Sequence, residues 1–260
     1  RDAGEMTVAA RTLGICHPPS YPVYVLLGRL ASAFPLGNPA YALNLLSVLA
    51  ASAALSLLFF ILTGLHGAWP AGCAVVLLAF NASFRDAAGV QEMYSLTLLF
   101  AVVLLGLALR LNRQWRLRQW HGAMFLAGFF LGNRTDLLLW APGLVWLAFP
   151  AGFRRANPGE KASFLAASAG FALLGLSVYL FLPIRSLQGP WLDWNHPATA
   201  ANFLVSLTRS GYGGTLDLLS KSYAPGAMFL PNLKVYAAHF WRNFGPLGLV
   251  LTLAGLAAGR

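Results

Sequence analysis

The chain has 260 residues, of which 58% are hydrophobic and only 10% are charged. Soluble domains carry about 25% charged residues because their exterior must stay polar, so this composition excludes an ordinary soluble domain and predicts an integral membrane protein. The net charge of +10 does not indicate nucleic-acid binding, since the basic residues form short clusters between long apolar runs, as in the cytoplasmic loops of multi-pass proteins.

Residues 1–40 are expected to form a first loop on the outer side of the membrane. Within this loop, residues 21–34 are apolar but short, and they lie between Pro18-Pro19 and Gly37-Asn38-Pro39. This segment predicts an interfacial helix on the outer surface. If it spanned the membrane instead, Asp2 and Glu5 would lie on the opposite face from Glu92. The chain starts on Arg1 without a Met, so an upstream segment is expected to be missing.

Apolar runs of ~20 residues predict membrane-spanning helices. The fold class is therefore all-α, a single polytopic transmembrane bundle of about seven spans with interfacial helices on the outer face. Residues 41–184 hold most of the helical spans, 185–239 form an outer loop, and 240–259 form the last span. The segments 119–132 and 137–150 are short and form either two spans or a re-entrant hairpin. The expected spans are 41–64, 69–85, 92–110, 119–132, 137–150, 162–184 and 240–259.

The charged residues orient the bundle. The loops on one side carry the basic residues Arg110, Arg113, Arg116, Arg118, Arg154, Arg155 and Lys161. The positive-inside rule makes that side cytoplasmic. Of the eight acidic residues only Glu160 falls inside, which leaves seven outside. Glu92 and Asp136 lie at the mouths of apolar helices, where a carboxylate is costly and indicates a functional site.

Two short motifs in the first outer loop could carry chemistry. Asp2 and Glu5 lie three residues apart and would share one face of a helical turn. A carboxylate at the membrane boundary can act as a general base, although a solvated helix start explains the same spacing. His17 precedes Pro18-Pro19, which fixes an extended backbone and holds the imidazole in a set position.

Further polar residues lie where other predicted helices meet the outer surface. Glu92 and Tyr94 open one span, while Arg134 and Asp136 lie between two short apolar runs and could simply pair with each other. Arg185 ends another span, where it could either reach the interface or bind a phosphate.

Asp193 and Trp194 belong to a cluster of polar and aromatic residues between Pro190 and Pro197. Such a cluster suits contact with a sugar or lipid headgroup, and it also suits an ordinary aromatic belt.

Several of these segments, taken together and in order, resemble a large family of polytopic proteins first described as a domain of unknown function. That family is related to the protein O-mannosyltransferase of plexin-type receptors. The start of the chain looks like the family's D-x-G-E followed by L-G-x-x-H-P-P-G-Y-P-L-Y, with Ser20 in place of the second glycine. The later matches are Asn44-Leu45-Leu46-Ser47, Glu92-Met93-Tyr94-Ser95-Leu96, Leu182-Pro183-Ile184-Arg185-Ser186, Pro190 with Asp193-Trp194 and Pro197, and Tyr212-Gly213.

The resemblance implies a GT-C-type glycosyltransferase that moves a sugar from a polyprenyl-phosphate donor to a protein or glycan hydroxyl. It also implies an active site on the outer face of a membrane, which is the cell inner membrane in a bacterium. Asp2 is then the expected general base, with Glu5 its alternate or partner. Arg185 is the first choice for stabilising the leaving phosphate and Arg134 the second, the latter by position alone.

In the same interpretation His17 and Glu92 position the sugar or the acceptor. No cofactor is certain, and a divalent cation stays open, because some GT-C enzymes require one while Asp2 and Glu5 alone are too few ligands. The chief alternative is a transporter or flippase for a lipid-linked or small polar solute. A different membrane transferase and a non-catalytic subunit are further alternatives.

Overall fold

The computed structural model describes residues 2–35, 37–149, 153, 157–210 and 226–258. Every regular element in these ranges is a helix, and the only extended pairing there is an isolated bridge between Ile15 and Asp193. The predicted all-α class is therefore confirmed. Arg154, Arg155 and the Tyr212-Gly213 motif lie outside the described residues.

Three helices in this part of the chain are long and apolar enough to cross a membrane. They are α3 (Pro39–His66), α6 (Tyr94–Arg113) and a continuous helical stretch over Pro158–Ser186. That stretch comprises α9 (Pro158–Leu176), η3 (Ser177–Leu180) and α10 (Phe181–Ser186). A fourth span results if α4 (Ala68–Ala79) and α5 (Ala82–Ala88), which are bent by 69°, count as one. The prediction of about seven spans was therefore too high.

The described residues of each expected span are mostly helical, but the backbone interrupts or shortens several of these spans. α7 (Leu117–Leu131) has 15 residues and rises only about 22 Å, less than the roughly 30 Å of a bilayer core. The next apolar segment is divided between η1 (Thr135–Trp140) and the short α8 (Ala141–Ala148). Asn81 breaks the α4–α5 pair, because its side chain caps α5 by accepting a hydrogen bond from the Phe84 N–H.

The C-terminal part of the chain also differs in detail from the expectation. α11 (Ala200–Thr208) lies within the predicted outer loop, and α12 (Phe229–Ala258) begins before residue 240. α12 has non-helical dihedral angles at Gly245, just before Pro246. A proline at that position cannot donate the helical hydrogen bond, so the kink has a local cause.

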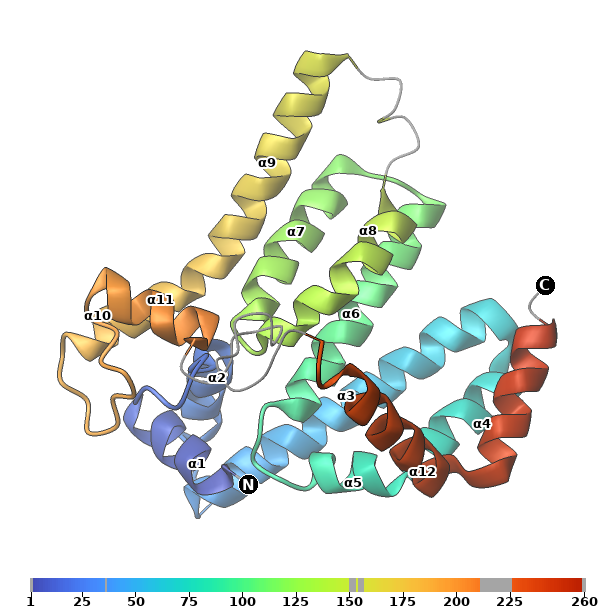
Figure 1. Cartoon of the computed structure of the whole chain (residues 1–260), viewed down its shortest axis with the longest axis horizontal. Coiled ribbons are helices and arrows are strands. Elements are labelled where there is room, and N and C mark those ends of the chain that lie inside the picture. The colour runs from blue at the N-terminus through green and yellow to red at the C-terminus, as the bar shows by residue number, and fades with distance from the viewer. Residues whose placement is uncertain (1, 36, 150–152, 154–156, 211–225, 259–260) are drawn as a thin grey trace.

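Figure 1 shows α6, α7, α8 and α9 running alongside one another. α1 (Ala3–Thr12), α2 (Pro22–Ala31) and the turn between α7 and η1 gather at one end of these helices, while the α6–α7 connection and the start of α9 lie at the other. The candidate site residues are thus separated from the basic loop segment that the charge pattern assigned to the cytoplasm.

Close packing of α7 against α9 fixes the geometry of the site end. A Cβ added at Gly128 would collide with the carbonyl oxygen of Ala172, and one at Gly175 with that of Phe125. The Trp120 indole N–H donates to Ser168 Oγ at 2.8 Å across the same pair of helices. Trp120 lies in the first turn of α7, whereas Gly128 lies in the half that precedes Arg134. These contacts together hold α7 in register with α9, whose helical stretch continues to Arg185.

Candidate active site

The two N-terminal carboxylates both lie near His17, in different ways. The Glu5 carboxylate accepts the backbone N–H of His17 at 2.8 Å, and its second oxygen lies 2.8 Å from His17 Nδ1. Asp2 Oδ2 lies 3.7 Å from His17 Nε2. The side chain of Asp2 is 59% exposed and that of Glu5 only 22%. Glu5 therefore orients the imidazole, and Asp2 keeps a carboxylate open to an incoming group.

The segment between α1 and α2 is held from both sides. Leu13 adopts a left-handed conformation that ends α1, and Pro22 begins α2. The Ile15 N–H donates to the Leu192 carbonyl at 2.7 Å, and the Trp194 N–H donates to the Ile15 carbonyl at 3.1 Å. The loop that contains Asp193 therefore pairs with the backbone just before His17.

Tyr21 connects this group to the next, although it was not among the predicted site residues. Its hydroxyl lies 3.2 Å from His17 Nε2. With Glu5 accepting from Nδ1–H, Nε2 is the acceptor and the phenol donates to it. Burial raises the pKa of Tyr21 to about 12, although the charges of Arg134 and Arg209 oppose this shift. The phenol therefore stays protonated at physiological pH.

Arg134 and Asp136 form the second group, beside Tyr94. Arg134 Nε donates to both Asp136 oxygens at 3.0 and 2.9 Å, and Nη2 lies 2.7 Å from Oδ2. The guanidinium carbon lies 4.9 Å from the centre of the Tyr94 ring, within cation–π range. Burial alone would lower the pKa of Arg134, but the hydrogen bonds and charge of Asp136 raise it above its ordinary value.

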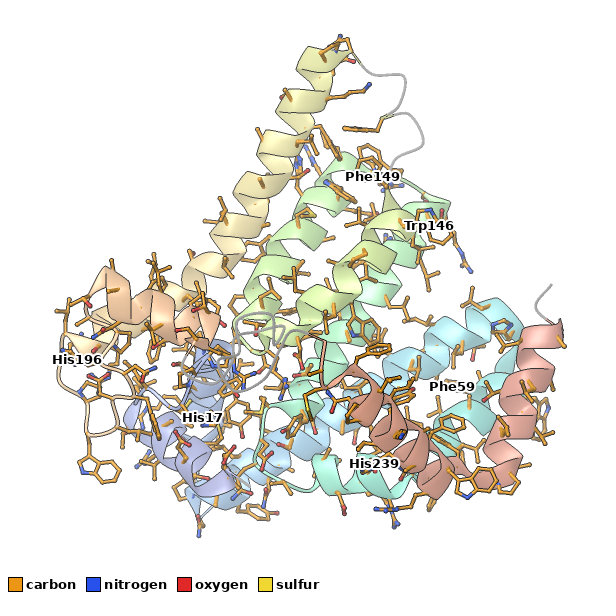
Figure 2. All side chains as sticks on the ribbon, in the orientation of Figure 1. His17, Phe59, Trp146, Phe149, His196 and His239 are labelled. Carbon is orange, nitrogen blue, oxygen red and sulfur yellow. The ribbon has the colours of Figure 1, made fainter. Side chains whose placement is uncertain are left out.

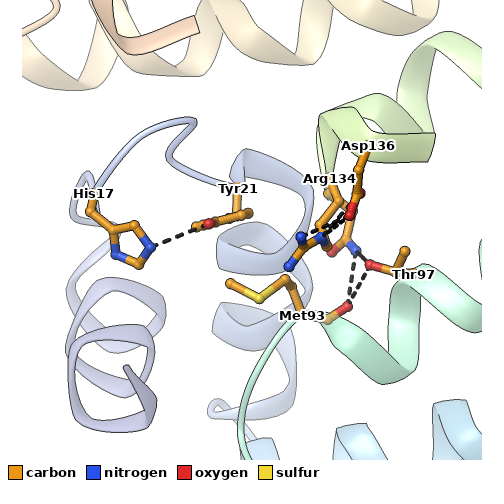
Figure 3. A network of polar contacts seen from close by, with 7 residues as sticks. His17, Tyr21, Met93, Thr97, Arg134 and Asp136 are labelled. Carbon is orange, nitrogen blue, oxygen red and sulfur yellow. Dashed lines mark hydrogen bonds and ion pairs between the residues drawn. The ribbon is translucent and has the colours of Figure 1, made fainter. Parts of the chain in front are cut away.

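Asn133, fully buried, attaches this group to α6. Its amide nitrogen donates to the Met93 carbonyl at 3.1 Å and to Thr97 Oγ1 at 2.9 Å. Figure 3 shows the resulting arrangement, with Tyr21 between His17 and the Arg134–Asp136 pair. The two groups thus face each other across a single tyrosine.

Glu92 lies in a different setting from the exposed acids. It is 6% exposed, and its Oε1 has no hydrogen-bond partner within the described ranges. It lines a small pocket together with Ser83, Asp86 and Tyr94. Tyr94 therefore borders both this acidic pocket and the Arg134 group.

Arg185 is engaged with the end of α1. Its Nε donates to the Leu13 carbonyl at 2.8 Å, and Nη2 donates to the Thr12 carbonyl at 3.0 Å. Nη1 donates to Gln188 Oε1 at 2.6 Å. These bonds satisfy carbonyls at the C-terminal end of α1, where a positive charge also complements the helix dipole.

Asp193 and Trp194 lie behind the His17 segment. Asp193 Oδ2 accepts from Ser186 Oγ at 2.9 Å and lies 2.7 Å from His196 Nδ1. Ser186 Oγ contacts that same histidine nitrogen at 3.1 Å, so these three residues lack the serial arrangement of a hydrolase triad. Trp194 is 40% exposed. Figure 2 shows His17 and His196 at the same end of the molecule.

A small pocket next to Tyr21 completes the site. Its lining consists of Pro19, Tyr21, Arg134, Thr135, Asp136 and Arg209. Arg209 follows α11 and was not expected here, since nothing in its surrounding sequence marks it. Tyr21 could have been found, because it belongs to the same proline-rich motif as His17. The described residues contain no group of three or more His, Cys, Asp or Glu side chains arranged to hold a metal ion.

Comparison with known proteins decides the family. Residues 2–157 match the family model described as the N-terminal domain of protein O-mannosyl-transferase TMEM260. The chain belongs to this family. The matched residues include both groups of the site, from Asp2 to Asp136. The resemblance inferred from the motifs is therefore confirmed.

Two relatives extend this comparison beyond residue 157. Protein O-mannosyl-transferase TMEM260 of Mus musculus is 31% identical over 223 residues, which are 82% of this chain and 31% of the relative. Protein O-mannosyl-transferase tmem260 of Dictyostelium discoideum is 25% identical over 274 residues, 98% of this chain and 33% of the relative. The chain thus spans about a third of the length of these curated relatives. No solved structure matches the chain significantly.

Proposed function

We propose that this chain carries the catalytic part of a membrane mannosyltransferase of the GT-C type. In this proposal a mannose passes from a polyprenyl-phosphate donor to a Ser or Thr hydroxyl of a protein on the outer face of the membrane. The relatives named as protein O-mannosyl-transferases support the sugar and the acceptor. The observation that carries the proposal is the exposed Asp2 carboxylate beside the Glu5–His17–Tyr21 chain of contacts.

Asp2 acts as the general base in this mechanism. The acceptor oxygen attacks the anomeric carbon while Asp2 takes the hydroxyl proton. The bond from that carbon to the phosphate oxygen breaks, and polyprenyl phosphate leaves with the electron pair. A single displacement of this kind inverts the anomeric configuration. Glu5 and His17 hold the site in place, because the imidazole bonds to Glu5 at one nitrogen and to Tyr21 at the other.

The positive charge required by the leaving phosphate comes from Arg134 in preference to Arg185. Arg185 already donates to two backbone carbonyls and to Gln188. Glu92 and Tyr94 border the pocket next to Arg134 and are assigned to the sugar hydroxyls. Trp194 and Asp193 lie at the same end as His17, where the exposed indole could contact sugar or lipid headgroups.

The test uses the full-length protein in membranes, with mannosyl polyprenyl phosphate as donor and a Ser/Thr peptide as acceptor. Asp2→Asn should lower the transfer rate by about a hundredfold or more, the usual size of a general-base contribution. The matched control is Glu160→Gln, which changes a carboxylate in the first turn of α9, far from the site, and retains its capping ability.

Full transfer by Asp2→Asn would exclude Asp2 as the base. If the protein moved the lipid-linked sugar across vesicle membranes without forming any mannosylated peptide, the flippase interpretation would replace the transferase interpretation.

A further inference from the structure

The pocket beside Tyr21 brings together two guanidinium groups from distant parts of the chain. Arg134 comes from the turn after α7, and Arg209 from the end of α11. Arg209 Nε is buried and has no hydrogen-bond partner among the described residues. Asp136 contacts Nε and Nη2 of Arg134, so Nη1 has no hydrogen bond to any of the described residues. Both arginines therefore have donors left for a ligand.

The charges that line this pocket sum to one positive charge. Arg134 and Arg209 each contribute one positive charge, and Asp136 contributes one negative charge. Two guanidinium groups with unused N–H donors match the oxygens of a phosphate group, which they bind through charge-assisted hydrogen bonds. Tyr21 and Pro19 close the remaining walls. The pocket is thus complementary to a small anion with a single negative charge.

An apolar cavity begins next to this pocket. Leu131 and Leu137, three residues before and three residues after Arg134, both line it. The cavity continues between α6, α7 and α8, where its walls include Leu104, Met124 and Leu144. An anion pocket whose flanking leucines line an apolar cavity fits one molecule that carries a phosphate on a hydrocarbon chain.

We propose that Arg134 and Arg209 together bind the phosphate of a lipid-linked phosphodiester, with its hydrocarbon chain in the cavity between α6, α7 and α8. This inference rests on the proposed function, because it locates the donor phosphate of that reaction. The inference makes Arg209 a ligand of the donor phosphate, although Arg209 lies beyond the family match over residues 2–157. Arg185 then has the separate role of bonding to the end of α1.

Asp136 sets the charge preference of the pocket. The donor is a phosphodiester with one negative charge, which the pocket balances. The product is a phosphomonoester, which carries about −1.5 to −2 at pH 7. The Asp136 carboxylate repels the additional charge, so it weakens product binding relative to donor binding. This difference favours release of polyprenyl phosphate after transfer.

Binding without transfer tests the pocket. The full-length protein in phosphatidylcholine nanodiscs is titrated with farnesyl phosphate in the absence of any acceptor. Arg134→Met and Arg209→Met should each weaken binding about ten- to a hundredfold, the size of a lost charge-assisted hydrogen bond. Arg11→Met is the matched control, because Arg11 is an exposed arginine on α1 that lines no part of the pocket. This variant should bind farnesyl phosphate as tightly as the unmodified protein. Unchanged binding by Arg209→Met would overturn the proposal.

Two further measurements identify the ligand and guard against misfolding. Arg209→Lys keeps the charge and should recover part of the affinity, whereas affinity as low as in Arg209→Met would overturn a charge-based role. Farnesyl phosphate should bind more tightly than inorganic phosphate, and Ala123→Leu, which fills the apolar cavity, should remove that advantage. If phosphatidylglycerol bound with the same dependence on both arginines, the pocket would belong to bulk lipid and not to the donor.

The charge preference has its own test. Asp136→Asn should tighten binding of farnesyl phosphate several-fold more than binding of mannosyl farnesyl phosphate, since only the monoester carries the extra charge. An equal change for both ligands would overturn the role of Asp136. These binding results can hold even if Asp2→Asn retains transfer, so failure of the proposed catalysis and failure of the phosphate site remain distinguishable.

Discussion

Replacing Arg185 by Met should free the end of α1 while leaving the phosphate pocket intact. Arg185 donates two hydrogen bonds to the Thr12 and Leu13 carbonyls. A hydrogen bond to a charged group contributes about 1.5–3 kcal/mol. Because the Arg185 side chain is partly exposed, we discount the pair to about 2–3 kcal/mol in total. That free energy corresponds to a roughly 30- to 150-fold larger population of the detached segment.

Hydrogen exchange measured by mass spectrometry reports this opening directly. The amides of Ile15 and His17 are hydrogen-bonded in the folded site, so their exchange should accelerate by that factor in Arg185→Met. The lysine of Arg185→Lys can form only some of these hydrogen bonds, so its exchange rate should lie between those of Arg185→Met and the unmodified protein. Arg11→Met should exchange at the rate of the unmodified protein.

The opposite result would refute this reasoning. If Arg185→Met left exchange at residues 13–17 unchanged but weakened farnesyl phosphate binding, Arg185 would be a ligand of the phosphate. The role first expected from its position at the end of a span would then be correct.

Three further predictions concern packing and the site. Gly128→Ala should lower the free energy of unfolding by about 1–3 kcal/mol in a detergent unfolding assay, because the added methyl group meets the α9 backbone. Gly122→Ala, which has open space around it, should leave that free energy unchanged. Equal effects of the two substitutions would contradict the close crossing of α7 and α9. His17→Phe removes both ring nitrogens and should slow mannosyl transfer about ten- to a hundredfold, and wild-type rates would exclude a positioning role. Asn133→Ala loses two buried hydrogen bonds to α6 and should lower the same unfolding free energy by about 2 kcal/mol, and an unchanged value would contradict that attachment.

Hydropathy predicted where the long apolar helices lie, because each long apolar run became largely helical. It did not predict α1 or α11, which lie in segments expected to be loops. It overestimated the spans because short local features end helices inside apolar sequence. Asn81 caps α5, and Gly245 followed by Pro246 kinks α12. Mean hydropathy over a segment does not register such single residues, although each of them is visible in the sequence.

The site was predicted unevenly for a comparable reason. The three-residue spacing of Asp2 and Glu5 predicted a shared helical face, and Pro18-Pro19 marked His17. The contact between His17 and the two carboxylates was not predicted. Arg134 and Asp136 form the ion pair that was one of their two predicted interpretations, and both residues also line a pocket. Arg209 reaches that pocket through the packing of helices far apart in sequence, and a single sequence contains no record of that contact.

The segment from His17 to Tyr21 separates Asp2, the proposed base, from the proposed phosphate pocket, and this separation has a consequence for substrate choice. One oxygen joins the anomeric carbon to phosphorus in every sugar phosphate, so the reacting atoms of a mannosyl and a glucosyl donor would fit this spacing equally well. Discrimination between epimers would then depend on the groups to which the proposed function assigns the ring hydroxyls, the buried Glu92 and its neighbour Tyr94. In this proposal, binding of the donor phosphate and choice of the sugar are separate properties, because they are assigned to different pockets.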